Sequence, residues 1–461
     1  MEVYICDPDM IKEYRDVSDD HLSMFAVMTD EFQFKWTAPG GQYDAHRLGT
    51  PVMAKALGWQ RLRTLHPKDP FFAEMATICR EGLDQGLRML GSPGTPCPTS
   101  ASSNMVSVHP RDQKDVGGGD GEWISVPCFP LALEVVSLVT SKSLFGDADF
   151  WDDPKFLEIC REYAAAVPRD AMLLHTVPEF LKPYVLEFFT VRKLYHKITD
   201  IICGELRSRR TIQKGKLADT PSRDLLDFGR QWIADSDYVN MYQDIHVANL
   251  ISFTVFAALH TSSQLITLTI YELASRPEYV RGLRGEVEKC MAEHGAWTKA
   301  SIDAMHALDS FIKETQRCNV LNASSLERIA LKPFTFTNGL HLPKGTWIGT
   351  PHSPLFQDEA YYPNPSDFDP MRHARMRDSP DPQVRRQSPI TATSDHSMHF
   401  GHGRHTCPGR HMASDEVKLV MAHLLLSYDF ALFGPRPENM RLLKFNVPDM
   451  TARIWLRQRK Q

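Results

Sequence analysis

The sequence predicts a mainly α-helical fold with a minor β portion, because its residue pattern changes along the chain. Between residues 71 and 317, apolar residues recur at the spacing of amphipathic helices, as in FFAEMATICREGLDQGLRML (residues 71–90). After Arg317, short segments rich in strand formers alternate with Asn-Gly, Pro and Gly turns. The 461 residues include 42% hydrophobic and 24% charged residues, as in a soluble protein with a large core. We expect a single domain over residues 1–461.

Charge and cysteine content limit the possible partners. The net charge of -5 and a pI near 6.4 do not favour nucleic acid. The nine cysteines are scattered, odd in number and without a Cys-x-x-Cys pair, which indicates a reducing compartment.

Three segments bear on membrane contact and order. The charged N-terminus is unlike a signal peptide or a membrane anchor. Residues 246–271 are uncharged and long enough to cross a membrane, but a central His-Thr-Ser-Ser cluster favours a buried core helix. Residues 91–121, rich in Gly, Pro and Ser, are expected to be a disordered insertion.

A lone cysteine, Cys407, lies in the segment FGHGRHTCPG (residues 400–409), directly before a helical pattern. Glycines allow a tight loop whose backbone N–H groups point at the sulfur, and the next helix begins beside it. Both features lower the pKa of a thiol. A buried core cysteine would not explain these glycines. A zinc site lacks a second ligand pair elsewhere in the sequence, although several histidines lie close by: His399, His402, His405 and His411.

This segment resembles the haem-binding signature of the cytochrome P450 superfamily, Phe-x-x-Gly-x-[His/Arg]-x-Cys-x-Gly. Its fixed positions are filled by Phe400, Gly403, His405, Cys407 and Gly409. The resemblance implies the cytochrome P450 fold, a helical bundle with small β-sheets around a buried haem b. It also implies that Cys407 is the axial thiolate ligand of the iron.

A second similarity concerns the support of this loop. Glu314 and Arg317, at i and i+3, share one helix face and can pair, a spacing common on surface helices. In the superfamily the same spacing marks a helix whose Glu–Arg pair locks against a later arginine, here Arg372. The resemblance implies that the three residues hold the loop that presents Cys407.

A third similarity lies in the long uncharged helix. The segment AALHT (residues 257–261) resembles the oxygen-binding segment of the superfamily, which implies that Thr261 offers its hydroxyl to bound oxygen. The alternative is that Thr261 only hydrogen-bonds a helix carbonyl. His260 stands where many members carry an acid, and this variant resembles a subset of fungal members. His260 then either relays protons or hydrogen-bonds locally.

Arg328, in the segment LERI (residues 326–329), resembles the arginine that meets a haem propionate, and His405 is the second candidate for that role. Residues 43–47 resemble, less closely, a helix that supplies further propionate donors.

The resemblance implies a monooxygenase that uses O2 and electrons from a separate NADPH-cytochrome P450 reductase, because the sequence contains no flavin or nicotinamide domain. Apolar residues around Phe253, Phe256 and Ala257 and in segment 320–325 predict a lipophilic substrate, and the similarity to fungal members favours a terpenoid secondary metabolite. The resemblance also implies that the protein works at the cytosolic face of the endoplasmic reticulum membrane. Because no anchor is visible in the sequence, a shortened, cytoplasmic chain is the other expectation.

The alternative function is that of a non-catalytic or damaged haem-binding relative.

Overall fold

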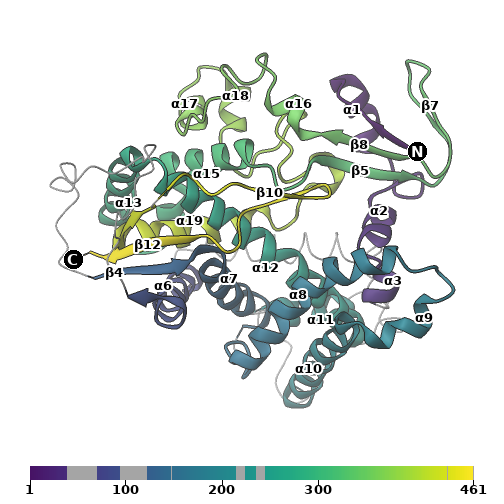
Figure 1. Cartoon of the computed structure of the whole chain (residues 1–461), viewed down its shortest axis with the longest axis horizontal. Helices are drawn as coiled ribbons and strands as arrows, with labels where there is room; N and C mark the ends of the chain where they lie inside the picture. The colour runs from purple at the N-terminus through teal and green to yellow at the C-terminus, as the bar shows by residue number, and fades with distance from the viewer. Residues whose placement is uncertain are drawn as a thin grey trace.

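The computed structural model describes residues 1–38, 70–93, 122–146, 148–213, 224–234, 244–432 and 434–459. Helices form the body of this part of the chain, and small sheets lie at its edges (Figure 1). The prediction of a mainly α fold with a minor β portion is confirmed. The stretch at residues 43–47 lies outside the described residues.

The described helices vary from single turns to a long central rod. They are α1 (Pro8–Arg15), α2 (Met24–Glu31), α3 (Phe34–Thr37), α6 (Phe71–Leu90), α7 (Cys128–Phe145), α8 (Pro154–His175), α9 (Lys182–Val185), η3 (Leu186–Phe188), α10 (Thr190–Gln213), α11 (Leu225–Ala234), α12 (Asp244–Ala274), η4 (Pro277–Tyr279), α13 (Val280–His294), α14 (Lys299–Asp303), α15 (His306–Cys318), α16 (His352–Phe356), α17 (Arg372–Arg377), α18 (Pro382–Gln387), η5 (Gly403–His405) and α19 (Arg410–Ser427).

Two four-stranded sheets flank the helices, on opposite sides in Figure 1. The first has the order β1 (Glu2–Tyr4), β8 (Trp347–Pro351), β5 (Ser324–Ala330) and β2 (Leu22–Ser23), with β1 parallel to β8. The second has the order β3 (Ser92–Pro93), β4 (Trp123–Pro127), β12 (Arg453–Gln458) and β9 (Tyr428–Ala431). Two further pairs are β6 (Phe334–Thr335) with β7 (His341–Leu342), and β10 (Met440–Leu442) with β11 (Phe445–Val447).

The disordered insertion expected over residues 91–121 stays a prediction, and the described start of that segment forms a short strand. Ser92 and Pro93 form β3 and pair with Ser125 and Ile124 of β4. A strand partner thus orders these residues despite their turn-forming composition. Residues 94–121 lie outside the described residues.

Helix α12 runs through the core, as the sequence predicted for the long uncharged stretch. It packs against α7, α8, α10, α15 and α19, and every residue from Leu265 to Ala274 is buried. A helix that is apolar nearly all round is stable only when neighbours cover all its faces. Ala257 and Thr261 are nonetheless exposed. They lie four residues apart and therefore on one face.

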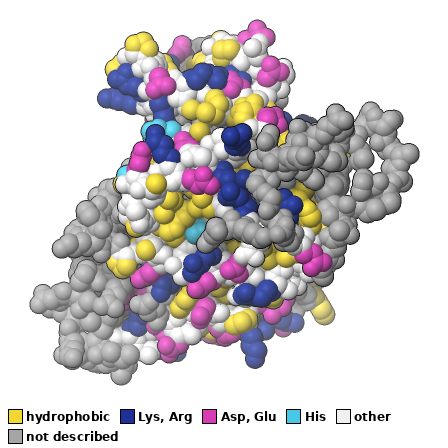
Figure 2. All heavy atoms as spheres, turned by 90° about the vertical axis from the view of Figure 1, so that its left-hand side faces the viewer, with side chains coloured by type: hydrophobic (Ala, Val, Ile, Leu, Met, Phe, Trp, Pro, Cys, Tyr) yellow, Lys and Arg dark blue, Asp and Glu magenta, His cyan; other side chains and the backbone are white. Residues whose placement is uncertain are grey.

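The surface is mixed in charge. On the face shown in Figure 2, lysine and arginine side chains alternate with aspartate and glutamate side chains, and apolar side chains lie between them. This distribution agrees with the small net charge of the sequence.

Candidate functional site

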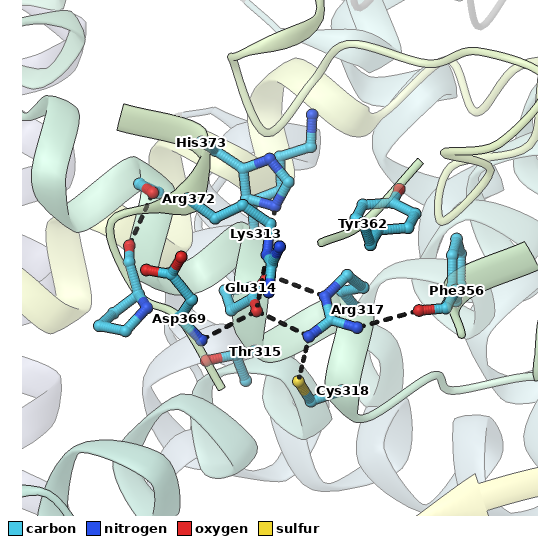
Figure 3. Close-up of polar contacts among 12 residues, drawn as sticks. Lys313, Glu314, Thr315, Arg317, Cys318, Phe356, Tyr362, Asp369, Arg372 and His373 are labelled. Carbon is cyan, nitrogen blue, oxygen red and sulfur yellow. Dashed lines mark hydrogen bonds and ion pairs between the residues drawn. The ribbon is translucent and has the colours of Figure 1, made fainter. Parts of the chain in front are cut away.

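The structure brings Glu314, Arg317 and Arg372 into one buried cluster (Figure 3). Glu314 and Arg317 lie on the buried face of α15, and both side chains are 0% exposed. Nη2 and Nε of Arg317 donate to Oε1 and Oε2 of Glu314 at 2.7 and 2.9 Å. Nε of Arg372, at the start of α17, donates to Oε1 at 3.2 Å. The predicted contacts of the trio are therefore present.

This cluster fixes an irregular segment of backbone. Arg317 donates to the carbonyl oxygens of Phe356 at 3.0 Å, Pro365 at 2.7 Å and Asp367 at 2.9 Å. Arg372 donates to the carbonyl oxygen of Pro363 at 2.7 Å. Carbonyl groups in a segment without regular structure need partners, and the two guanidinium groups supply them here.

The ionisation of Glu314 follows from its partners. Burial raises the pKa of its carboxyl. The side chains of His373 and Arg317 lower this pKa by a larger amount, so the net pKa lies below the usual range. Nε2 of His373 lies 3.4 Å from Oε2 of Glu314. Burial lowers the pKa of His373 to about 4, so its imidazole is neutral at neutral pH. No pattern in the sequence indicates this histidine contact.

The Cys407 loop is tightly closed. The N–H of Cys407 donates to the carbonyl of Phe400 at 2.7 Å, and the N–H of Thr406 donates to that of Gly403 at 3.1 Å. Gly401 and Gly403 have φ values of 67° and 73°, which L residues with a side chain rarely adopt. The signature glycine Gly403 is therefore required by the backbone itself.

The sulfur of Cys407 receives the predicted backbone hydrogen bonds, and these lower the pKa of the thiol as expected, but its net pKa is raised. Burial raises the pKa of the thiol and outweighs the N–H groups of Gly409 and Arg410 and the charge of Arg410. Local spacing in the sequence indicates the dipoles around the sulfur but not its desolvation. A thiolate at this position needs a strong positive charge beside it, and a bound metal ion is one that deprotonates a thiol outright.

The neighbouring histidines do not form a zinc site with Cys407. The ring of His399 stacks on Phe356 with centroids 4.4 Å apart, and Nδ1 of His402 lies 3.0 Å from Oγ1 of Thr393. Over the residues that the structure describes, no three His, Cys, Asp or Glu side chains gather around one point.

Arg328 and His405 present polar groups that fit an anionic cofactor. Arg328 is 1% exposed, and its hydrogen bonds in the described structure go to the carbonyls of Glu327 at 2.8 Å and Arg15 at 3.4 Å. Its Nε is buried without a hydrogen-bond partner among the described residues, and burial lowers the pKa of the guanidinium. Nε2 of His405 lies 3.1 Å from Oδ2 of Asp19. A buried cation without a paired anion is costly, and a carboxylate such as a haem propionate would compensate Arg328.

Thr261 is exposed on α12, whereas the neighbouring side chain of His260 is partly buried. Oγ1 of Thr261 donates to the carbonyl of Ala257 at 2.8 Å, which is the local hydrogen bond that the sequence left open as an alternative. The ring of His260 lies parallel to Phe129, with centroids 6.0 Å apart. Burial lowers the pKa of His260 to about 4, so this imidazole is neutral at neutral pH.

Glu416, on α19, is a buried acid that sequence reasoning missed. The hydroxyl groups of Ser262, the neighbour of Thr261, and of Thr140 on α7 act on its carboxyl and lower its pKa, but burial raises the pKa by more. Burial raises the pKa of Glu416 to about 8, so the carboxyl is protonated at neutral pH. No local pattern singled out this residue, because the charged residues Asp415 and Lys418 stand beside it in the sequence.

Comparison with known proteins agrees with this geometry. Residues 127–451 match the sequence model of the family described as Cytochrome P450. The cytochrome P450 monooxygenase terQ of Tolypocladium album is 50% identical over 462 residues, which cover 100% of this chain and 80% of that protein. The monooxygenases ltmQ of Epichloe festucae var. lolii and paxQ of Penicillium paxilli are 45% and 37% identical, each covering 100% of this chain and 83% of the relative.

The fold and the matched region thus define a protein of the haem-thiolate type. The chain belongs to the cytochrome P450 family, and it is a haem-dependent monooxygenase related to fungal enzymes.

Proposed function

We propose that Cys407 is the axial ligand of haem b and that the enzyme oxidises a lipophilic small molecule of the terpenoid type. The closed loop around Cys407 carries this proposal, because the N–H groups of Gly409 and Arg410 are already directed at the sulfur. When bound, the haem supplies the redox chemistry that activates O2. The protein residues supply ligation, charge compensation and proton delivery.

Arg328 and His405 are the proposed partners of the haem propionates. The unpaired Nε of Arg328 would gain a carboxylate partner, which removes the cost of a buried single charge. Glu314, Arg317 and Arg372 would act at a distance, by fixing the segment before the Cys407 loop.

Thr261 is the proposed proton donor toward O2. Its side chain is exposed on a helix that is mostly buried, so rotation about χ1 would release Oγ1 from the carbonyl of Ala257. His260, being neutral, would act by hydrogen bonding and not as an imidazolium acid.

An aromatic cluster supports a lipophilic substrate. Phe253 and Phe256 of α12 meet Phe34 with ring centroids 5.7 and 6.2 Å apart. Phe32 lies between this group and Phe445 of β11. The centroid of its ring is 5.0 Å from that of Phe256 and 6.4 Å from that of Phe445. The rings of Phe32, Phe253, Phe256 and Phe445 are only partly buried and present apolar surface.

The cluster also connects the two segments that the sequence proposed as walls of the substrate site. Phe445 pairs with Asn322 in an isolated bridge, and Asn446 donates to the carbonyl of Leu321 at 2.8 Å. The segment 320–325 therefore lies beside the same rings as Phe253 and Phe256. Large apolar substrates suit a wall of this kind.

A panel of ligands tests the substrate class. Neutral terpenoids added to the haem-loaded enzyme are expected to shift its Soret band, and Phe256→Ala is expected to weaken their binding more than Met89→Ala, an exposed control on α6. A Soret shift produced only by small charged acids would contradict the proposal.

We further propose that electrons come from an NADPH-cytochrome P450 reductase and that the protein works at the cytosolic face of the endoplasmic reticulum membrane. Large apolar side chains are exposed between the end of α8 and η3, which supports contact with a membrane surface: Met172, Leu173, Phe180, Leu181, Tyr184 and Phe188. In a flotation experiment, the protein is expected to rise with phospholipid vesicles. The double variant Phe180→Ser, Phe188→Ser is expected to reduce the fraction of protein bound to the vesicles. Unchanged flotation of the double variant would contradict this contact.

The alternative of a non-catalytic or damaged relative has no observation in its favour. The Glu314 cluster and the Cys407 loop are both fully formed.

A further inference from the structure

The end of helix α1 lies against the outer side of the Cys407 loop, although 388 residues separate the contacting groups. Oδ1 of Asp16 accepts a hydrogen bond from the backbone N–H of Arg404 at 2.8 Å. A Cβ atom added at Gly403 would lie 2.5 Å from the same oxygen. The glycine thus permits both the positive φ of the loop and its close approach to Asp16.

Arg15 fixes the direction of the Asp16 carboxylate. Its Nε donates to Oδ2 of Asp16 at 3.0 Å, which leaves Oδ1 for Arg404. Its Nη1 lies 2.9 Å from Nε2 of His402 and also donates to Asp395, so it reaches two further residues of the same loop region.

The other described contacts of this loop with neighbouring segments are made by side chains: His402 lies 3.0 Å from Thr393, and His405 lies 3.1 Å from Asp19. Its internal hydrogen bonds, such as Cys407 N–H to the carbonyl of Phe400, close the inner turn. Gly401 and Gly403 make the backbone between them easy to distort, because glycine has wide conformational freedom. A carboxylate accepting a backbone N–H is a strong, charge-assisted restraint on such a segment.

We propose that Asp16 is a positioning residue for the haem site: it holds the backbone at Gly403 and Arg404 so that Cys407 stays at ligand distance from the iron. This inference rests on the proposed ligation by Cys407. The N-terminal segment touches neither Cys407 nor Thr261 in the described contacts. Through Asp16 it would nevertheless stabilise thiolate ligation.

The test compares Asp16→Ala and Asp16→Asn with the unmodified enzyme, all loaded with haem. Two quantities are measured: haem content per folded protein, and the rate at which the red-shifted Soret band of the reduced carbon-monoxide complex is lost on warming. Asp16→Ala is expected to keep its haem but to lose the band roughly tenfold faster, the effect of one lost charge-assisted hydrogen bond. Asp16→Asn keeps an acceptor oxygen but loses the charge, so it is expected to lose the band about threefold faster, between the unmodified enzyme and Asp16→Ala.

Asp20→Ala is the matched control, because Asp20 is an exposed acid four residues further on that pairs with Lys332 and Ser18. A rate for Asp16→Ala equal to that of Asp20→Ala would overturn the proposal. If Asp16→Ala does not fold, the Asn variant decides: a rate of band loss equal to that of Asp20→Ala would overturn the proposal. An unmodified enzyme without the red-shifted band would overturn the proposed ligation by Cys407, and this inference with it.

Discussion

Arg317 and Glu314 form a doubly hydrogen-bonded ion pair within one helix, and both side chains are completely buried. Burial of two charges is favourable only when their remaining hydrogen-bonding groups are satisfied, and here backbone carbonyls and Arg372 satisfy them. The main role of the pair is therefore to hold the backbone between residues 356 and 367, and its own net contribution to stability is small.

Removing one member of this pair should be strongly destabilising. Arg317→Ala is expected to lower the free energy of unfolding by about 3–5 kcal/mol, because Glu314 would stay buried without its main partner. Urea unfolding of the haem-free protein measures this. Lys289→Ala, which breaks the exposed pair with Glu293, is the control and should change stability by less than about 1 kcal/mol. Similar effects of both variants would contradict the role given to the buried pair.

Arg328 should affect the haem-free and haem-loaded proteins in opposite directions. Arg328→Met removes a buried charge without an ion-pair partner among the described residues, so the haem-free protein should be as stable as the unmodified one or more stable. The same variant should lose haem roughly tenfold faster, because the propionate loses a charge-assisted partner. Unfolding by urea and haem transfer to an acceptor protein measure the two effects. Arg375→Met, an exposed control on α17, should change neither; slower haem loss in Arg328→Met would contradict the proposed pairing.

Buried histidines should make the protein sensitive to acid. Burial lowers the pKa of His352 and of His373 to about 4, and the pKa of His399 lies well below its usual value for the same reason. Below the ordinary histidine pKa of about 6.5, the unfolded chain binds protons that the folded protein does not, so stability falls as pH falls toward 4.

Each of these groups contributes up to about 1.4 kcal/mol per pH unit in this window. His352→Gln should reduce the slope of unfolding free energy against pH between 6.5 and 4, whereas the exposed control His341→Gln should not. An unchanged slope in His352→Gln would contradict the neutral, buried state of this imidazole.

Glu416 should give the opposite dependence at higher pH. Its pKa of about 8 means that the folded protein keeps a proton that the unfolded chain releases near pH 4.5. Stability from this group is therefore present at low pH and falls as pH rises from 4.5 to 8. Glu416→Gln, which cannot ionise, should remove this fall and raise stability at pH 8, while the exposed control Glu438→Gln should not. Greater alkaline sensitivity in Glu416→Gln would contradict a protonated carboxyl.

The sequence predicted those parts of the site that depend on local spacing. Glu314 and Arg317 share a helix face at i and i+3, and the glycines around Cys407 indicated a tight loop before a helix. The missed contacts join distant segments: Asp16 with Arg404, His373 with Glu314, and Glu416 with Ser262. No local pattern encodes such pairs, because the fold alone brings them together.

Burial was the other quantity that sequence reasoning did not estimate. The helix dipole and loop N–H groups around Cys407 were inferred correctly, yet desolvation decides the direction of the thiol pKa. Desolvation also keeps His260 neutral, so this residue is expected to act by hydrogen bonding and not as an acid.

The reduced carbon-monoxide difference spectrum of the haem-loaded enzyme and of Cys407→Ala tests the central claim most directly. Thiolate ligation by Cys407 predicts a strongly red-shifted Soret band in the unmodified enzyme and its complete loss in the variant. The same band in Cys407→Ala, or no such band in a folded, haem-loaded unmodified enzyme, would contradict the assignment of Cys407 as the iron ligand.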